Sequence, residues 1–143
     1  MGRDLNILLV EDNEGDIRLI REAFSERCIN YDFSLARDGE EALNYLYRRE
    51  EFKEAVKPDI ILLDINLPKI NGFEILQKIK EDPELRRIPV IIISSSSSQE
   101  HIYRSYDLRA NSYLTKPSDF DEYIDVVKTI EDFWFNKAQL PSD

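Results

Sequence analysis

Three carboxylates follow two strongly apolar runs of this sequence. Glu11 and Asp12 come directly after the run at 7–10, and Asp64 comes directly after the run at 60–63. Runs that are apolar at every position are typical of central strands in a parallel sheet, where ligands bind outside the carboxyl ends of the strands. Carboxylates gathered there repel one another unless a cation compensates, and hard divalent cations prefer oxygen ligands. The pattern therefore predicts a Mg²⁺ site.

Two further strand-like runs also end in a residue that can do chemistry. Ser94 follows the apolar run at 90–93, and Lys116 follows the run at 113–115. In chain order, an acid pair, a lone Asp, a hydroxyl and a Lys thus stand at four strand ends. Together they are the parts needed to transfer a phosphoryl group to a carboxylate: a metal site, a nucleophile and groups that stabilise negative charge.

Four ordered segments carry a resemblance to a known family. They are LLVEDN at 8–13, DIILLDINLPKINGFEIL at 59–76, PVIIISS at 89–95 and SYLTKP at 112–117. With these segments the chain resembles the response-regulator receiver domains of two-component signalling. Two more segments, NEGDIRLIREAF and IEDFWF, are similar to those of the phytochrome-associated response regulators. The resemblance implies a phosphorylation switch that is served by a sensor histidine kinase of the phytochrome-like kind and that has no turnover activity.

The resemblance also assigns the chemistry to individual residues. It implies that Asp64 is the phospho-acceptor and that Mg²⁺ is bound by Glu11, Asp12, Asp64 and the backbone carbonyl of Asn66. It implies that Lys116 stabilises the phosphoryl oxygens.

The same resemblance names the residues that would respond to phosphorylation. Ser94 contacts the phosphoryl group and moves towards it, and Tyr113 then rotates inward as the aromatic switch. Because an X–Pro bond adopts the cis form at modest cost, a cis bond before Pro117 is the arrangement expected to aim Lys116 into the site.

Strand-like and helix-like segments alternate along the whole chain. Strands are expected at 7–10, 31–36, 60–63, 88–94 and 112–115, and helices after 13–14, around 42–46, from 71–72 to 82–83, at 99–108 and from about 120 to 136. Five such units predict an α/β fold, a parallel sheet with helices on both faces. By resemblance it is flavodoxin-like and doubly wound, with strand order 2-1-3-4-5.

Length and composition predict a single cytoplasmic domain, and the resemblance implies that it is a receiver over residues 1–143 without an output domain. The chain has 29 acidic against 19 basic residues, a formal charge of −10, and no basic stripe for phosphate backbones, so direct nucleic-acid binding is not expected. No apolar stretch approaches the roughly 20 residues that cross a bilayer. The single cysteine, Cys28, excludes an intramolecular disulfide and fits a reducing compartment.

The last helix carries more apolar surface than one core stripe needs. Tyr123, Val127, Ile130 and Trp134 share one helical face that should pack on the sheet. The remaining aromatic surface, rimmed by acids, suggests a protein contact, and in this family the fourth and fifth helices and the fifth strand commonly dimerise. A homodimer, enhanced by phosphorylation, is therefore expected, with these interface candidates: Tyr123, Val126, Phe133 and Phe135. The alternative is that the C-terminal segment folds back onto its own domain.

Three other functions are compatible with parts of the pattern. A phosphohydrolase of the haloacid dehalogenase type also uses an aspartyl nucleophile but needs a second Asp two residues later, where this chain has Asn66. A nucleotide or flavin binder would have a glycine-rich first turn, whereas residues 11–16 are acidic. A scaffold receiver that is not phosphorylated would lack a site residue, and none is missing here.

Overall fold

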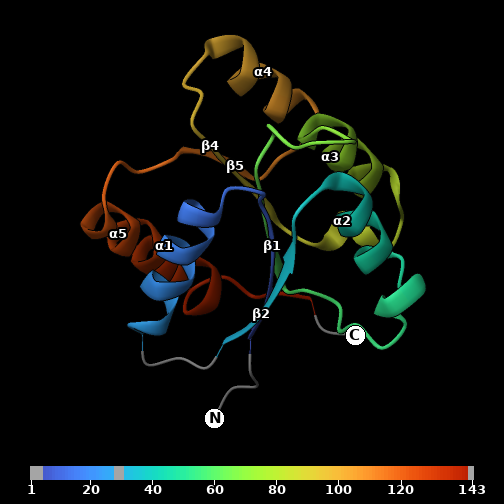
Figure 1. Cartoon of the computed structure of the whole chain (residues 1–143), viewed down its shortest axis with the longest axis horizontal. Helices are drawn as coiled ribbons and strands as arrows, with labels where there is room; N and C mark the ends of the chain where they lie inside the picture. The colour runs from blue at the N-terminus through green and yellow to red at the C-terminus, as the bar shows by residue number, and fades with distance from the viewer. Residues whose placement is uncertain (1–4, 28–30, 142–143) are drawn as a thin grey trace.

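The computed structural model describes residues 5–27 and 31–141 (Figure 1). Five parallel strands form one sheet in the order β2-β1-β3-β4-β5, which confirms the predicted α/β doubly wound fold. Cys28 lies outside the described residues. The strands are β1 Leu5–Val10, β2 Tyr31–Ala36, β3 Ile60–Leu63, β4 Val90–Ser94 and β5 Ser112–Thr115.

Helices cover both faces of this sheet. In Figure 1, α1 and α5 lie next to each other on one side of the strands, and α2 and α3 lie on the other. The helix α4 contacts α3 and β5 at the edge where the strands end. The helices are α1 Glu14–Ser25, α2 Gly39–Leu46, α3 Gly72–Glu81, α4 Gln99–Asp107 and α5 Phe120–Ile130, with the short 3₁₀ turns η1 Glu50–Phe52 and η2 Leu85–Arg87.

Alternation along the central strands divides the core into two halves. Leu8 and Val10 of β1 pack with α2 and α3, whereas Ile7 and Leu9 pack with α1 and α5. Because side chains alternate across a strand, a run that is apolar at every position fills both cores. This is why β1, β3 and β4 occupy the centre of the sheet.

Each of the five α-helices begins at a side chain that caps it. Asn13, Asp38, Asn71, Ser98 and Asp119 each accept a hydrogen bond from a backbone N–H three residues later. These residue types satisfy an N–H group that the first helical turn leaves without a partner. The caps therefore fix where each helix starts after the preceding strand, at the end of the sheet where the predicted site lies.

The C-terminal helix differs from the single extended helix expected over about 120–136. It is α-helical to Ile130 and continues as a π-helical turn, η3, over Glu131–Phe135. The buried Glu131 carboxylate accepts hydrogen bonds from Arg27 at 2.8 and 3.1 Å and from the hydroxyl of Tyr31 at 2.8 Å. These contacts tie the turn to the residues just after α1 and to β2, so the segment folds back onto its own domain.

We expect the Glu131 contacts to make stability depend on pH. The hydrogen bond from Arg27 lowers the pKa of Glu131 despite its burial, and Tyr31 assists. Because the native pKa is depressed, this stabilisation is complete above the ordinary pKa of 4.5 and is lost as pH falls through the native value. At neutral pH, Glu131→Gln should lower the unfolding free energy by about 1–3 kcal/mol.

Urea unfolding between pH 3 and pH 7 measures this effect. The difference between wild type and Glu131→Gln should shrink on the acidic side, whereas the exposed control Glu26→Gln should stay close to wild type throughout. A pH-independent difference would contradict the assignment.

Candidate functional site

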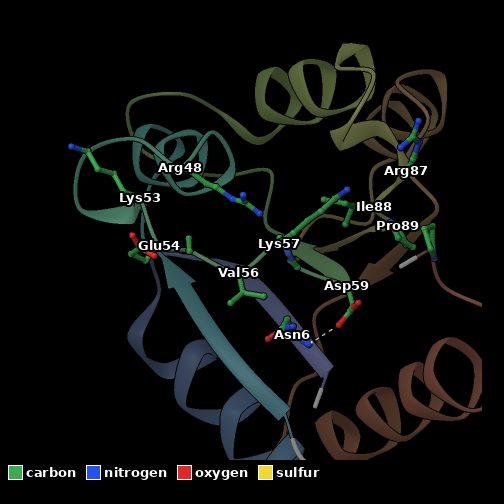
Figure 2. Close-up of a pocket in the computed structure, with 13 residues that line it drawn as sticks. Asn6, Arg48, Lys53, Glu54, Val56, Lys57, Asp59, Arg87, Ile88 and Pro89 are labelled. Atoms are coloured by element: carbon green, nitrogen blue, oxygen red, sulfur yellow. Dashed lines mark hydrogen bonds between the residues drawn. The ribbon is translucent and has the colours of Figure 1, made fainter. Parts of the chain in front are cut away.

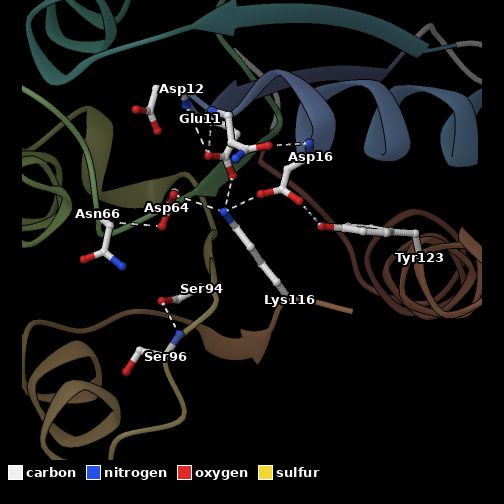
Figure 3. A network of polar contacts seen from close by, with 10 residues as sticks. Glu11, Asp12, Asp16, Asp64, Asn66, Ser94, Ser96, Lys116 and Tyr123 are labelled. Carbon is white, nitrogen blue, oxygen red and sulfur yellow. Dashed lines mark hydrogen bonds and ion pairs between the residues drawn. The ribbon is translucent and has the colours of Figure 1, made fainter. Parts of the chain in front are cut away.

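The ammonium group of Lys116 lies at the centre of a carboxylate cluster (Figure 3). Its Nζ atom is 2.9 Å from Glu11 Oε1, 2.8 Å from Asp16 Oδ2 and 3.3 Å from Asp64 Oδ2. The parallel pairing of β1, β3, β4 and β5 brings these groups to the carboxyl end of the sheet. The residues predicted from separate strand ends, Glu11, Asp64 and Lys116, are thus in direct contact.

Asp64 is held at the end of β3 with its side chain almost fully buried. Its Oδ1 atom accepts a hydrogen bond from the backbone N–H of Asn66 at 3.1 Å. The start of α3 packs tightly against this loop, because a Cβ atom on Gly72 would lie 2.5 Å from the Asp64 carbonyl oxygen and 2.4 Å from Cα of Ile65. Only glycine permits this approach without moving the backbone that carries Asp64.

Glu11 is the most deeply buried acid of the cluster, with 1% of its surface exposed. Its Oε2 atom accepts hydrogen bonds from the backbone N–H groups of Asp12 and Asn13, both at 3.2 Å. Burial raises the pKa of Glu11 to about 7, although the hydrogen bond to Lys116 opposes the rise; the charge on Asp64 adds to it. A second cation beside Glu11 would therefore favour its ionised form.

Asp16 completes the cluster and was not among the predicted site residues. It lies in the first turn of α1, where an acid has the ordinary role of favouring the helix dipole. The Tyr123 hydroxyl donates a hydrogen bond to its Oδ1 atom at 3.0 Å, which leaves Oδ2 for Lys116. The sequence signal available was position alone, since the acidic turn at 11–16 follows a central strand.

Lys116 remains charged in this environment. Burial lowers the pKa of Lys116, but hydrogen bonds to Asp16 and Glu11 and the charges of Glu11 and Asp64 together raise it above its ordinary value. One cation nevertheless faces three acids at contact distance. The cluster therefore keeps an excess of negative charge that a divalent cation would offset.

The donor set fits a hard divalent cation. Oxygen atoms of Glu11, Asp12 and Asp64 lie within 4.8 Å of one another, and Asp12 is exposed at the mouth of the site. Figure 3 shows the Asp12 carboxylate at the outer edge, away from Lys116. Carboxylate oxygens with room for water are typical ligands of Mg²⁺.

Ser94, at the end of β4, and Tyr113, in β5, both contact Ser96 in the loop after β4. The buried Ser94 hydroxyl accepts a hydrogen bond from the Ser96 N–H at 3.1 Å, and the hydroxyl of Tyr113 donates to the Ser96 carbonyl at 2.7 Å. The Ser96 hydroxyl lies 2.8 Å from Nδ1 of His101 in α4. Tyr113 is half-buried against the α3 side of the core, so Ser96 links both predicted switch residues to α4.

The structure contradicts two of the residue predictions. The peptide bond before Pro117 is trans, the isomer favoured by about 0.5–1 kcal/mol, and Lys116 reaches the carboxylates from that arrangement. Tyr123 is not a surface residue, because only 1% of it is exposed and its hydroxyl contacts Asp16.

The other interface candidates differ in exposure. Val126 is half-buried and Phe135 packs against Tyr31, with 5.7 Å between ring centroids. Phe133 is 54% exposed and is the only one of the four candidates that the structure presents fully at the surface.

Comparison with known proteins decides the family. The model of the response regulator receiver domain matches residues 7–128. The chain belongs to this family. The response regulator Rcp1 of Synechocystis sp. is 39% identical to this receiver domain over 136 residues, which cover 95% of this chain and 92% of Rcp1. The chain described here is therefore a receiver domain in phosphorylation-dependent signalling, as the sequence motifs predicted.

Solved structures place the receiver domain near phytochrome regulators. The phosphorylated cyanobacterial phytochrome response regulator RcpA superimposes with a TM-score of 0.93 at 46% identity, covering 98% of this chain and 100% of that chain. The Mn²⁺-bound form of Rcp1 gives 0.90 at 38% identity, covering 96% and 99%. Both agree with the predicted fold and sub-family. No helix among the described residues is long and apolar enough to cross a membrane.

Proposed function

We propose that Asp64 of this receiver domain accepts a phosphoryl group from a sensor histidine kinase. Glu11, Asp12, Asp64 and the backbone carbonyl of Asn66 would hold Mg²⁺, and Lys116 would stabilise the transferred group. The observation that carries this proposal is the contact between Lys116 and the buried Asp64, at 3.3 Å, within an acid cluster that has oxygen ligands for a cation.

The transfer exchanges one bond to phosphorus for another. An Asp64 carboxylate oxygen forms the new P–O bond while the P–N bond to the donor imidazole breaks, and the imidazole keeps the bonding electron pair. Mg²⁺, when bound, supplies positive charge that offsets the repulsion between carboxylate and phosphoryl group. Lys116 supplies a second positive charge from its position beside Asp64, and the trans peptide bond before Pro117 does not prevent this.

Phosphorylation would be passed on through the loop after β4. The phosphoryl group adds roughly −1.5 to −2 charge beside Lys116 and offers oxygen atoms that the Ser94 hydroxyl can contact. If the Ser94 hydroxyl turns towards the phosphoryl group, it leaves the Ser96 N–H, which shares the Ser96 backbone with the Tyr113 contact. The loop and Tyr113 would therefore respond together.

The α4–β5–α5 face is the surface proposed to carry the signal. Ser105 is the only residue of α4 that is buried. The helix therefore has few packing contacts with the core, which allows it to shift. Two aromatic side chains of α4 are exposed, Tyr103 by 68% and Tyr106 by 49%, and Phe133 of η3, which follows α5, is 54% exposed. We propose that these residues form a homodimer interface that phosphorylation strengthens, with a partly buried Val126 at its rim.

The kinase proposed for this receiver is phytochrome-like, since similar structures include a bacteriophytochrome response regulator as well as RcpA. A cytoplasmic location and a single receiver domain without turnover activity remain predictions. The phosphohydrolase alternative is not favoured, because Asn66 stands where its general acid is needed. A scaffold that is never phosphorylated is not favoured either, because the acidic cluster and Lys116 are assembled.

Incubation with acetyl phosphate tests the proposed chemistry. Intact-mass spectrometry should detect the gain of one phosphoryl group with Mg²⁺ and little or none with excess chelator, because the acid cluster then keeps its negative charge. Equal labelling with and without Mg²⁺ would contradict the metal site. Asp12→Asn should weaken Mg²⁺ binding, since the site loses one anionic ligand.

Light scattering tests the proposed dimer. A beryllofluoride phosphate mimic with Mg²⁺ should shift wild type towards the dimer, and Tyr103→Ala with Phe133→Ala should reduce that shift because they remove exposed aromatic surface. The control Val56→Ala removes another exposed apolar side chain, in the segment between η1 and β3, and should dimerise like wild type. A monomer under both conditions would contradict the dimer, and unchanged amide exchange over residues 95–135 would contradict the switch.

A further inference from the structure

A surface hollow lies at the opposite end of the sheet from Asp64. It has a volume of about 380 Å³ and is bordered by residues that precede or begin the central strands, among them Asn6, Pro58 and Pro89. Figure 2 shows it between the start of β1 and the segment that joins α2 to β3. Its volume lies within the range of small-molecule sites, roughly 300–1,000 Å³.

The charge around this hollow is opposite to that of the whole chain. Four basic residues border it, Arg48, Lys53, Lys57 and Arg87, against the acids Glu54 and Asp59. The chain carries a formal charge of −10. Asp59 is buried and accepts a hydrogen bond from the Asn6 N–H at 2.9 Å. The hollow therefore presents more positive than negative charge to a ligand.

Neither arginine of the hollow has an acidic partner among the residues that the structure describes. Within residues 5–27 and 31–141, neither Arg48 nor Arg87 forms an ion pair, although acids outnumber bases in the chain. Figure 2 shows Arg48 and Lys57 extending into the space from different segments, with Arg87 above them, while Lys53 points outward. Arginine groups from separate elements suit a phosphate, which can accept several charge-assisted hydrogen bonds at once.

The backbone that presents Arg48 has an uncommon conformation. Arg48 and Glu50 have φ values of 56° and 54°, in the left-handed region that non-glycine residues rarely adopt. The N–H of Arg49 donates to the Asn44 carbonyl at 2.8 Å, which holds this turn against α2. The Tyr45 hydroxyl donates to the Val56 carbonyl at 2.9 Å and fixes the opposite wall. Strained backbone that its surroundings hold in place is frequent at ligand sites.

Part of the wall is apolar. Val56 is 56% exposed at the hollow, and Pro58, Ile88 and Pro89 also border it. An inorganic ion would leave this surface in water, whereas an organic group attached to the anion would cover it. We infer that the hollow binds a small organic phosphate, with Arg48, Lys57 and Arg87 on the phosphate and Val56 and Pro89 against the organic part.

Amide NMR of the full chain in chelator, titrated with adenosine monophosphate, tests this inference. Chelator keeps Mg²⁺ from bringing phosphates to the Asp64 site. Saturable shifts are expected at the amides of residues 48, 53–57, 87 and 88. Adenosine, which lacks the phosphate, should bind at least tenfold more weakly, and inorganic phosphate should also bind more weakly than the monophosphate. The absence of saturable shifts, or shifts centred on residues 11–16 and 64, would overturn the site.

Neighbouring arginines provide matched controls. Arg48→Ala combined with Arg87→Ala should weaken adenosine monophosphate about tenfold or more, because charge-assisted hydrogen bonds are lost. Arg49→Ala combined with Arg86→Ala removes the same charge, but Arg49 lies over the Tyr47 ring and Arg86 faces another surface hollow, so binding should change less than twofold. If both double variants bound adenosine monophosphate equally weakly, the loss would come from net charge alone, and the inference would be overturned. Labelling of Asp64 by acetyl phosphate should be unchanged in both pairs, so the two proposals fail independently.

Discussion

Asp64→Asn should abolish the gain of a phosphoryl group from acetyl phosphate and Mg²⁺. The amide cannot act as the anionic nucleophile, although it has nearly the same shape as the carboxylate and keeps an oxygen for the Asn66 N–H. The variant should fold, because it removes one charge from an acid-rich cluster rather than a packing contact. Intact mass reports the labelling, and amide NMR reports the fold.

An exposed aspartate provides the control for this loss. Asp125→Asn on α5 removes the same charge from a position outside the site and should be labelled like wild type. Full labelling of Asp64→Asn at another residue would show that Asp64 is not the phospho-acceptor. A folded variant without labelling would support the assignment in the same experiment.

Lys116→Met should produce the second large effect, a loss of stability when Mg²⁺ is absent. Glu11 and Asp64 are 1% and 5% exposed, so removing their shared cation leaves buried carboxylates without compensation. Breaking a buried ion pair in this way costs about 3–5 kcal/mol of unfolding free energy. Urea unfolding in chelator measures the loss.

Added Mg²⁺ should restore part of that stability, because it supplies positive charge to the same carboxylates. Lys128→Met, an exposed lysine on α5, is the matched control and should unfold like wild type under both conditions. If Lys116→Met loses no more stability than this control, the ion pairs at the site do not contribute as proposed.

The strand pattern and the main site residues were determined by local sequence. The apolar runs of β1, β3 and β4 fill both cores, which requires them to be central strands. Residues at the ends of such strands must converge, whatever the loops do. This is why Glu11 and Asp64 could be brought together from the sequence alone, with Lys116 at the end of the next predicted strand in the sheet. The predicted bounds of β2 and β5 also agree with the structure.

Only the tertiary structure decided the contacts made across long separations. Asp16 and Lys116 are 100 residues apart, and Arg27 and Glu131 are 104 apart, so no local periodicity relates them. The helical stripe predicted that Tyr123 packs towards the sheet, but its hydroxyl contact with Asp16 depends on how α5 packs on α1. Sequence patterns determine which face of an element is buried, whereas the partner of each polar group depends on the packing of whole elements.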